Sequence, residues 1–383
     1  MQPTTQLHQV RTLGFGPGTA LQCVDYLSAR RARSVFIVTA PQIRALCQPL
    51  ETGFAKQGCA VSIWDDVRQE PTISDFNRTL EAARGMKSDA VVGLGGGSAM
   101  DVAKLVAAFL QPAAQTLAQA FGVGKLQGRA TDLVCLPTTS GTGSEVSPIS
   151  ILLDESDELK KGVISEHLVP DAAYVDPLLA VSMPPGVTAS TGMDALTHCI
   201  EAYANRFSHP LVDTWALEGI RLISSNLVRA VQRGDDIEAR THLAQASLYG
   251  GLCLGPVNTA AVHALAYPLG GEFHVAHGVS NAVLLPHVLE FNLPAAPARY
   301  AQIAVAMGIK HTGDDMQTAR LGLQRIVALS RDCRIPAHMA DFGIPESAIE
   351  RMARAAMTVT RLLERNVRVV TEQDARDIYR KAI

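Results

Sequence analysis

The sequence predicts a two-domain protein, with an α/β domain built on a parallel sheet over residues 1–182 and an all-helical domain over residues 183–383. Short β-branched runs alternate with helical segments in the first part, as in a parallel sheet covered by helices. Beyond Met183-Pro184-Pro185 the apolar periodicity is mainly helical. The chain has 383 residues, of which 47 % are hydrophobic and 19 % charged, so each domain can bury a large core.

The first elements follow from β-branched runs and the residues that punctuate them. Residues 33–40 (RSVFIVTA) and 59–67 (CAVSIWDDV) are predicted strands. Between them Pro41 opens a helix that is expected to reach about Gly58. This strand–helix–strand order is typical of a parallel sheet, because two parallel strands need a crossover connection.

A capping pair marks the start of the next helix. Thr72 is followed three residues later by Asp75, which is a variant of the capping box, and Gly85 marks the expected C-cap. Residues 88–110 then predict a strand, a glycine loop and a helix. Residues 131–148 predict a strand that runs into a loop rich in threonine, serine and glycine.

The second half is predicted to be helical, with interruptions at glycine and proline. Gly270-Gly271 interrupts one apolar segment, and Thr371 with Asp374 resembles the capping box of a final helix. Proline cannot continue the backbone hydrogen bonding of a helix, so it is expected to break one. The expected breaks are Gly255-Pro256, Pro286, Pro294, Pro297, Pro336 and Pro345.

A glycine loop is predicted where the strand at 89–94 ends. Glycine lets the backbone turn sharply and approach a ligand, and the N-terminus of the next helix offers N–H groups to an anion such as a pyrophosphate. It is not the standard dinucleotide fingerprint, because Ser98 replaces the third glycine and no acidic residue follows at about the twentieth position. A tight turn without a ligand is the alternative. The loop consists of Gly95, Gly96, Gly97 and Ser98.

A second loop, rich in hydroxyl side chains, follows the strand predicted within 131–148. Its run PTTSGTGSE contains Thr138, Thr139 and Thr142. In an open α/β sheet the carboxyl ends of the strands form the ligand crevice, so the two loops are expected to share one site. Together they favour a nucleotide ligand.

A group of histidines and one aspartate indicates a metal site in the helical domain. Seven of the eleven histidines lie between residues 198 and 287. Asp194 and His198 are four residues apart in a helical segment, so they leave the same helix face. With His263 and His277 they form a mixed oxygen and nitrogen ligand set, which suits Fe²⁺ or Zn²⁺. The alternative is that Asp194 caps or solvates a helix and that the histidines are ordinary core or surface residues. Asp194 and His198 alone favour this alternative, whereas His263 and His277 favour a metal.

Composition indicates which classes of partner and which cellular compartment to expect. The net charge is -3 and no basic run stands out, so nucleic acid is not an expected partner. The first residues lack the apolar core of a signal peptide, and no apolar run reaches the ~18 residues of a membrane span. Seven scattered cysteines without a CxxC pair indicate reduced thiols, and we therefore expect a cytoplasmic protein.

Four segments together resemble the iron-containing (group III) alcohol dehydrogenase family. They are GLGGGSAMDVAK, PTTSGTGSEVSP, TGMDALTHCIEAY and HALAYPLGGEFHVAHGVSNAVLLPH, in the order of the family, and the similarity extends from LGFGPG at 13–18 to the C-terminus. The resemblance implies an N-terminal dinucleotide-binding domain, a C-terminal helical domain and a metal in the cleft between them. It also favours a homodimer or a larger homo-oligomer.

The resemblance assigns roles to individual residues. It implies that the metal ligands are Asp194, His198, His263 and His277 and that the metal is Fe²⁺, with Zn²⁺ as the alternative. It also implies an NAD or NADP cofactor. The residues implied to line that cofactor are Gly95, Gly96, Gly97, Ser98, Thr138, Thr139, Thr142 and Lys160. Lys160 has a rival interpretation, since Glu158, Lys160 and Lys161 could form a solvated loop.

Three positions depart from the pattern of the family, and the third, Asn366-Val367-Arg368, is expected to affect the local backbone more than the chemistry. Many members have a histidine, often assigned to a proton relay, at the position of Tyr267, and the ordinary tyrosine pKa of ~10 makes a poor proton acceptor at neutral pH. His274 is an alternative carrier of the proton. Several NAD-preferring members carry an aspartate where Ala40 follows Val38-Thr39. An acidic group at this position repels the 2′-phosphate of NADP(H). Because Ala40 carries no charge, NADP(H) is not excluded as the cofactor.

The implied function is that of a metal-dependent, NAD(P)-linked alcohol dehydrogenase or aldehyde reductase. It would interconvert a small alcohol, diol or hydroxy acid and its carbonyl compound by hydride transfer, with the metal polarising the substrate oxygen. A metal-independent maleylacetate-reductase-like enzyme fits poorly with an intact ligand set, and a glycerol dehydrogenase or a dehydroquinate-synthase-like lyase shares the fold. A metallohydrolase or a binding module would leave the loops or the ligands unexplained. The residues do not identify the alcohol.

Overall fold

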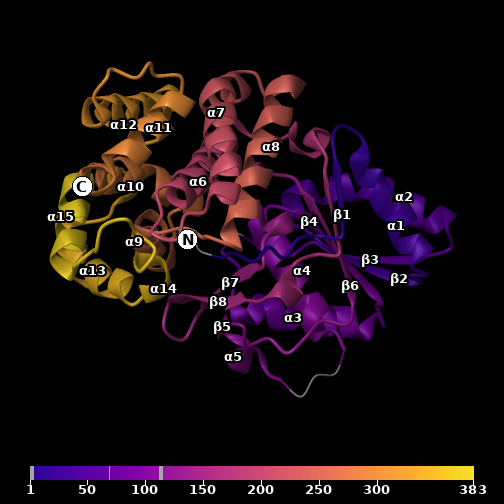
Figure 1. Ribbon diagram of the computed structural model, residues 1–383. Coiled ribbons are helices and arrows are strands. Elements are labelled where there is room, and N and C mark those ends of the chain that lie inside the picture. Colours follow the sequence, from indigo (N-terminus) through magenta and orange to yellow (C-terminus); the bar gives the residue numbers. More distant parts are fainter. Residues whose placement is uncertain (1–3, 69, 112–114) are drawn as a thin grey trace. The chain divides into compact units, whose positions relative to one another are not determined.

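Six parallel strands form the main sheet of the computed structural model, which describes residues 4–68, 70–111 and 115–383 (Figure 1). Their order across the sheet is β1-β9-β6-β4-β2-β3, and every neighbouring pair is parallel. The parallel sheet expected from the sequence is therefore confirmed. The strands are β1 (Thr12–Phe15), β2 (Ser34–Val38), β3 (Ala60–Trp64), β4 (Ala90–Gly95), β6 (Asp132–Pro137) and β9 (Ala172–Val175).

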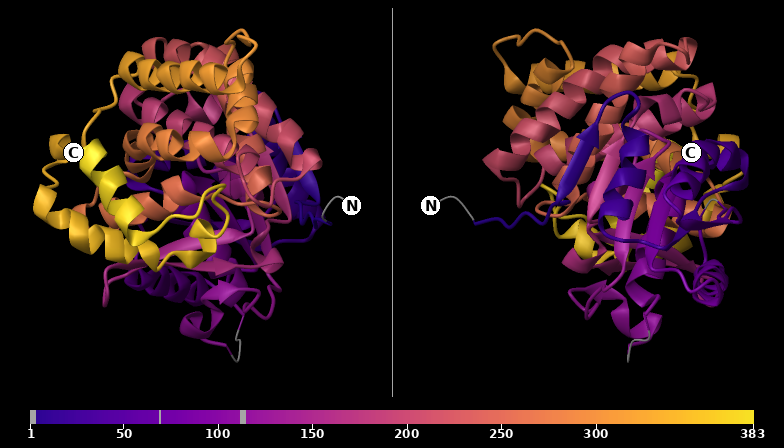
Figure 2. Two further views of the ribbon diagram at one scale, coloured as in Figure 1. Left: turned by 60° about the vertical axis from the view of Figure 1, so that its left-hand side comes forward. Right: turned by 90° about the vertical axis from the view of Figure 1, so that its right-hand side faces the viewer.

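Helices cover both faces of this sheet (Figure 2). Successive residues of a strand point to opposite faces, and β2 shows the consequence. Val35 and Ile37 pack in the cluster that contains α1 (Gln22–Ala29) and α2 (Gln48–Lys56). Phe36 and Val38 pack in the cluster that contains α3 (Ile73–Gly85) and α4 (Gly97–Phe109). A central strand that is buried on both sides reads as a continuous apolar run, which is why RSVFIVTA was recognisable.

A smaller sheet accompanies the main one. Its order is β5-β8-β7, and β7 and β8 are antiparallel neighbours joined by a short turn. This hairpin is not among the elements predicted from the sequence. The other short elements here are β5 (Gly122–Val123), β7 (Ile149–Asp154), β8 (Leu159–Ile164), α5 (Leu117–Ala120), and the 3₁₀ turns η1 (Thr19–Leu21), η2 (Pro41–Cys47), η3 (Ser144–Val146), η4 (Glu166–Leu168) and η5 (Pro177–Ala180).

The strand order places a topological switch between β2 and β4. From β2 the chain continues to β3 on one side, and the later strands β4 and β6 lie on the other side. Ligands of open α/β sheets bind outside the carboxyl ends of the strands at such a point. The register pairs Gly95 with Pro137. The glycine loop and the run PTTSGTGSE at 137–145, which we call the threonine loop, therefore begin side by side. Ala40, at the end of β2, lies on the same edge.

One local prediction is confirmed and two need correction. Thr72 and Asp75 form the expected reciprocal capping box at the start of α3. Gly85, however, is the last residue of α3, not a left-handed cap. The left-handed residue is Lys87 (φ 52), because helical bonding continues past Gly85. The helix expected from Pro41 is a 3₁₀ turn as far as Cys47, and only α2 is a regular α-helix.

From Met183 to Ile383, a range that is described throughout, the regular elements are helices, apart from a bridge between Asn205 and Asn366. Contacts divide the chain at this point into a sheet unit (7–139 and 143–182) and a helical unit, to which 140–142 and the described residues before Leu7 also belong. The helices are α6 (Pro185–Tyr203), α7 (Pro210–Gln232), α8 (Ile237–Leu254), α9 (Ala261–Phe273), α10 (His277–Asn292), α11 (Pro297–Ala306), α12 (Asp315–Asp332), α13 (Ile349–Met357), α14 (Thr360–Leu363) and α15 (Glu372–Ala382), with 3₁₀ turns η6 (Leu293–Ala295), η7 (Met339–Phe342) and η8 (Glu346–Ala348).

Two expected interruptions of the helical unit are wrong. Gly270-Gly271 lies inside α9, and Pro286 lies inside α10. Both helices are largely buried, and the packing of apolar faces decides helix formation more than local propensity does. Thr371 and Asp374 do form the expected capping box of α15. Among the described residues, no helix is both long enough and apolar enough to cross a membrane.

A buried lysine connects α4 to the segment that follows the threonine loop. Lys104 is fully buried, and its Nζ donates to Ser144 Oγ (2.7 Å) and to the carbonyls of Ser147 and Ile149 (both 2.9 Å). Asp101, one turn earlier on α4, accepts from Ser144 Oγ at 2.6 Å and from the backbone N–H of Ile151 at 2.9 Å. Burial lowers the pKa of Lys104 and raises that of Asp101. The pair thus holds α4, whose first residues belong to the glycine loop, against residues 144–151.

Replacing this lysine tests the connection. We expect Lys104→Met to lower the free energy of unfolding by about 3 kcal/mol, because Asp101 and two carbonyls lose a buried partner. Urea unfolding followed by circular dichroism measures the change. Lys56→Met, at an exposed position of α2, is the matched control and should change stability by about 0.5 kcal/mol or less. Equal stability of the two variants would contradict the proposed anchor.

Candidate metal centre and cofactor loops

Helix α6 presents two of the expected ligands from one face. Asp194 and His198 lie four residues apart on it, and their side chains are only 3 % and 5 % exposed. Glu201 follows one turn later and is also buried. A carboxylate buried to this degree is costly unless it is paired or hydrogen-bonded. The surroundings of Asp194 must therefore compensate for its charge.

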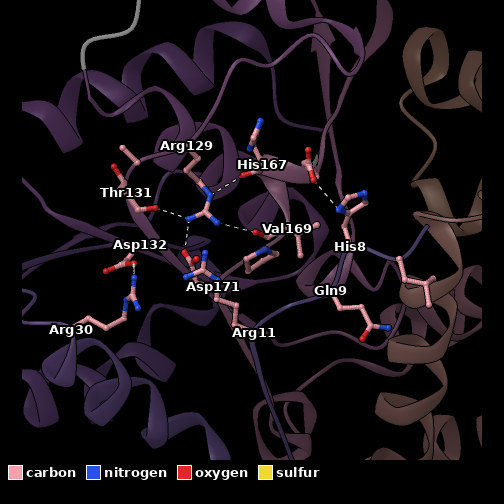
Figure 3. A pocket seen from close by; sticks show the side chains of 14 residues that line it. His8, Gln9, Arg11, Arg30, Arg129, Thr131, Asp132, His167, Val169 and Asp171 are labelled. Atoms are coloured by element: carbon pink, nitrogen blue, oxygen red, sulfur yellow. Dashed lines mark hydrogen bonds and ion pairs between the residues drawn. The ribbon is translucent and has the colours of Figure 1, made fainter. Parts of the chain in front are cut away.

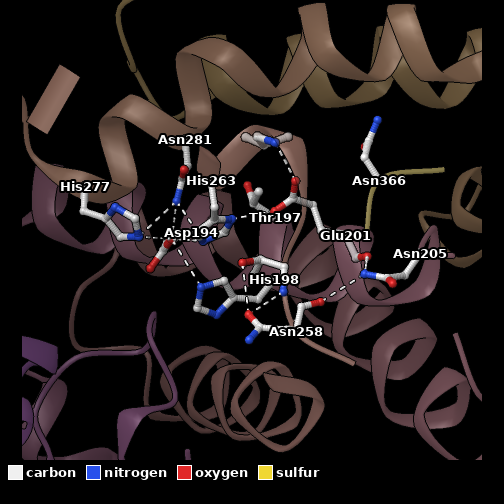
Figure 4. A network of polar contacts seen from close by, with 12 residues as sticks. Asp194, Thr197, His198, Glu201, Asn205, Asn258, His263, His277, Asn281 and Asn366 are labelled. Atoms are coloured by element: carbon white, nitrogen blue, oxygen red, sulfur yellow. Dashed lines mark hydrogen bonds and ion pairs between the residues drawn. The ribbon is translucent and has the colours of Figure 1, made fainter. Parts of the chain in front are cut away.

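The structure brings all four expected ligands together (Figure 4). One side-chain donor atom from each of Asp194, His198, His263 and His277 lies within 4.8 Å of the other three. Asp194 Oδ1 is 3.7 Å from His198 Nε2 and 3.6 Å from the Nε2 atoms of both His263 and His277. A tetrahedral ion with bonds of ~2.0–2.2 Å separates its ligand atoms by about 3.3–3.6 Å. The cluster therefore has the dimensions of a metal site.

Two glycines allow α10 and α8 to pack closely against α6. A Cβ atom at Gly278, the second residue of α10, would lie 2.3 Å from the carbonyl oxygen of Ser190 on α6. A Cβ at Gly250 of α8 would lie 3.2 Å from the Cβ of His198. Only a residue without a side chain fits at position 278 unless α10 moves away from α6. Such a shift would carry His277 away from Asp194.

Glu201 orients His263 from the side opposite to the cluster. Its Oε2 lies 2.5 Å from His263 Nδ1, and its Oε1 accepts the backbone N–H of Val262 at 2.6 Å. A carboxylate at Nδ1 keeps a proton on that atom and leaves Nε2 free to bind a metal. Glu201 was not singled out from the sequence, although the spacing His198-x-x-Glu201 on a helix was visible there.

The charges of the cluster stabilise one another. Burial opposes ionisation of Asp194, but His198, His277 and His263 together hold its pKa well below the usual range. Burial lowers the pKa of His198 to about 4, so this imidazole is neutral at pH 7. Burial also disfavours a charged His263, but Glu201 and Asp194 outweigh it and raise the pKa of His263 to about 9. Metal binding here therefore has to displace a proton from His263.

The donor set fits a divalent cation. One carboxylate and three imidazoles are ligands that Fe²⁺ and Zn²⁺ both accept. The buried Nδ1 of His198 has no hydrogen-bond partner among the described residues, whereas its Nε2 faces the other donors. This ring is therefore aligned for the cluster and not for a hydrogen bond elsewhere. A capped helix with ordinary histidines would not bring all four donor atoms together.

Six of the eight expected cofactor residues, all except Thr142 and Lys160, lie at the carboxyl edge of the main sheet. Gly95 ends β4, and the backbone N–H of Thr138 donates to its carbonyl at 2.9 Å. Gly96 is the N-cap of α4, and a Cβ there would lie 3.4 Å from Thr139. Gly97 and Ser98 form the first turn of α4, so they belong to the helix and not to a loop. Within the sheet unit the two loops thus meet, whereas Thr142 belongs to a segment of the helical unit.

Lys160 is not part of a solvated loop. It lies on β8, its side chain is 6 % exposed, and its Nζ is 2.5 Å from Glu70 Oε2. Lys161 is different, because it is partly exposed and pairs with Asp154 and Asp157. The rival interpretation therefore fails for Lys160. Its expected role at the cofactor stays a prediction.

The two candidates for proton transfer occupy different environments. Tyr267 lies on α9 one turn after His263 and packs, partly buried, against the helical core. His274 is exposed and ends α9 with a left-handed backbone (φ 54). His274 therefore has access to solvent protons, and Tyr267 is held by its neighbours. The role of each in catalysis stays a prediction.

A pocket of about 600 Å³ lies at the amino ends of the strands, on the edge of the sheet away from the two loops (Figure 3). Arg129 is its central cation, and it donates to the carbonyls of His167, Thr131 and Val169 and to Asp171. Arg30 pairs with Asp132 at 2.6 Å. These hydrogen bonds and this ion pair already occupy both arginines, and they connect the segments that lead into the strands.

Comparison with known proteins identifies relatives along almost the whole chain. A family model described as "Iron-containing alcohol dehydrogenase" matches residues 11–177, and one described as "Fe-containing alcohol dehydrogenase family, C-terminal" matches residues 188–383. Long-chain-alcohol dehydrogenase 1 of Geobacillus thermodenitrificans is 39 % identical over 372 residues, which cover 96 % of this chain and 94 % of the relative.

Two further relatives agree with this result. The 1,3-propanediol dehydrogenase of Citrobacter freundii is 34 % identical over 373 residues, which cover 96 % of both chains. The crystal structure of a 1,3-propanediol oxidoreductase superposes with a TM-score of 0.96 at 32 % identity and covers 100 % of both chains. The similarity therefore includes both the sheet unit and the helical unit.

The contact between Glu201 and His263 leads to a testable expectation. Glu201→Gln keeps the size of the side chain but removes the charge that holds the proton on Nδ1, so metal affinity should fall roughly 10- to 100-fold. Chelator competition, with the metal content read by elemental analysis, measures the change. Glu218→Gln on the exposed face of α7 is the control and should bind metal like the wild type. An unchanged affinity in Glu201→Gln would argue against the orienting role.

Proposed function

Because the chain belongs to the iron-containing alcohol dehydrogenase family, we propose that it is a metal-dependent dehydrogenase of small alcohols, diols or hydroxy acids. It is an alcohol oxidoreductase that uses a nicotinamide cofactor of the NAD type. The observation that carries the proposal is the convergence of one aspartate and three histidines on a single point of the helical unit. Two of its relatives are named as a 1,3-propanediol dehydrogenase and a 1,3-propanediol oxidoreductase and one as a long-chain-alcohol dehydrogenase, so relatives with this fold are named for more than one class of alcohol.

The residues of the chain divide the work of the reaction. Asp194, His198, His263 and His277 would hold the cation, which when bound supplies Lewis-acid polarisation of the substrate oxygen. Glu201 keeps His263 in the orientation that this requires. Tyr267 and His274 are the proposed carriers of the proton that the substrate oxygen gains or loses.

The loops of the sheet unit would hold the cofactor. The N-terminus of α4 offers backbone N–H groups to a pyrophosphate, and Gly95 and Gly96 let the backbone come close to it. Thr138 and Thr139 add donors at the adjacent strand end. With the nicotinamide in place, hydride transfer itself is the chemistry of the cofactor.

A metal-independent reductase of the same superfamily is the alternative. Such an enzyme has no use for one carboxylate and three imidazoles whose donor atoms all lie within 4.8 Å of one another. The distances of 3.6–3.7 Å from Asp194 Oδ1 to the three imidazole nitrogens are close to those between ligands of one cation, and they favour the metal-dependent enzyme. Analysis of bound metal separates the two possibilities.

A substrate screen with a matched variant tests the proposed function. Protein reconstituted with Fe²⁺ or Zn²⁺ should oxidise or reduce members of a panel of small alcohols and aldehydes, followed by nicotinamide absorbance. His263→Ala should lose metal and turnover together. His311→Ala, which removes an exposed imidazole paired with Asp315, should keep both. Full activity in a metal-free His263→Ala protein would refute the metal-dependent mechanism.

The end of β2 provides a test of cofactor choice. Ala40 carries no charge, so nothing at that position repels a 2′-phosphate, and we expect NADPH to be accepted. Ala40→Asp should lower kcat/KM for NADPH at least tenfold while leaving that for NADH within about twofold, because only the phosphate meets the new charge. Steady-state kinetics with both cofactors measure this. Ala40→Asn, of the same size without the charge, is the control; a similar loss in it would contradict the electrostatic explanation.

A further inference from the structure

Asn281 is a buried polar residue beside the four expected metal ligands, but it is not one of them. It lies on α10 one turn after His277, and its exposed fraction is 0 %. Figure 4 shows its side chain pointing into the same space as the four donor atoms. A buried amide needs hydrogen-bond partners, and its choice of partners reveals what it does.

The amide nitrogen of Asn281 lies over three of the donor atoms. Asn281 Nδ2 donates to Asp194 Oδ1 at 2.7 Å and lies 3.1 Å from His263 Nε2 and 3.3 Å from His277 Nε2. The amide faces the cluster with its nitrogen, which is the atom that can donate to the Asp194 carboxylate. In the described part of the chain, His198 Nε2 is not among its hydrogen-bond contacts.

Four donor atoms of this kind define a tetrahedron, and Asn281 covers one of its faces. We call the triangle formed by Asp194 Oδ1, His263 Nε2 and His277 Nε2 the Asn281 face. The three remaining faces all include His198. Any fifth ligand of a cation at the centre must enter through a face, and the Asn281 face is closed by the amide.

The exposure of the ligands restricts the entry further. The side chain of His277 is 28 % exposed, whereas those of Asp194, His198 and His263 are at most 5 % exposed. Access to the cluster from outside therefore lies on the side of His277. The faces that include both His277 and His198 remain open to a ligand from that side.

We propose that Asn281 is a positioning residue of the metal centre, which closes one face of the ligand cluster and directs the substrate oxygen to the faces that contain His198 and His277. The inference rests on the proposed function, because it needs the cation. It adds a control of the direction from which the substrate oxygen approaches the cation.

Packing alone does not account for the choice of asparagine. The Oδ1 of Asn281 is buried without a hydrogen-bond partner among the described residues, which costs free energy. Leucine has nearly the same shape and would avoid that cost. The amide nitrogen, by contrast, has a use, because it donates to the carboxylate that anchors the cluster.

Two substitutions separate closure of the face from the hydrogen bond. Asn281→Ala opens the Asn281 face and also removes the hydrogen bond to Asp194. Asn281→Leu removes the hydrogen bond but keeps the face covered. Asn292→Ala is the matched control, because Asn292 is a buried asparagine on the same helix whose amide pairs with Asn366, outside the donor cluster.

Cobalt(II) is a suitable probe, because its visible absorption reports the coordination number. We expect Asn281→Ala to take up an additional water, with at least a twofold fall in visible absorption per bound Co²⁺. Asn281→Leu should keep the wild-type spectrum and bind Co²⁺ roughly tenfold more weakly, as is usual when a partner of a metal ligand is lost. Asn292→Ala should match the wild type in both measurements.

The outcomes separate the inference from the function on which it rests. If wild-type protein binds no Co²⁺, the metal centre itself is refuted. If it binds Co²⁺ and Asn281→Ala keeps the wild-type spectrum, Asn281 does not close a face. A loss of absorption in Asn281→Leu equal to that in Asn281→Ala would also overturn the proposal, and Asn281→Leu preserves the test if Asn281→Ala fails to fold.

Discussion

The buried carboxylate of Asp194 is the interaction on which the candidate site depends. It is nearly inaccessible to solvent, and three imidazoles and one amide surround its Oδ1. A carboxylate in this position is tolerable only because each neighbour can compensate its charge. The packing of α10 on α6 through Gly278, and the contact between Glu201 and His263, both bring those neighbours to it. The helical unit is arranged so that one negative charge is surrounded from several sides.

Much of the fold could be predicted because the relevant signals are local. The buried strand β2 reads as an apolar run, and the capping boxes at Thr72 and Thr371 need only two side chains three residues apart. The β7–β8 hairpin was missed, and the breaks at Gly270-Gly271 and Pro286 were wrongly expected. Burial on both sides of α9 and α10 decides those elements, and burial depends on residues far away in the sequence.

The candidate site shows the same division. The four ligands were recognisable from their residue types and their resemblance to a family, and the structure places their donor atoms together. Glu201 and Asn281 were not recognised, although both stand within the segments that carry the resemblance. Glu201 contacts His263 and Asn281 contacts Asp194, and in both pairs the partner lies on another helix. The roles of Glu201 and Asn281 therefore could not be predicted from residue spacing along the chain.

The origin of the donor atoms has a consequence for the life of the protein in a cell. They come from α6, α9 and α10, so they meet only when these helices are folded together. A ligand that binds only the folded form shifts the folding equilibrium by mass action. A cation at this centre would therefore make resistance to proteolysis follow the metal supply. Under metal starvation the chain would be degraded faster at an unchanged rate of synthesis.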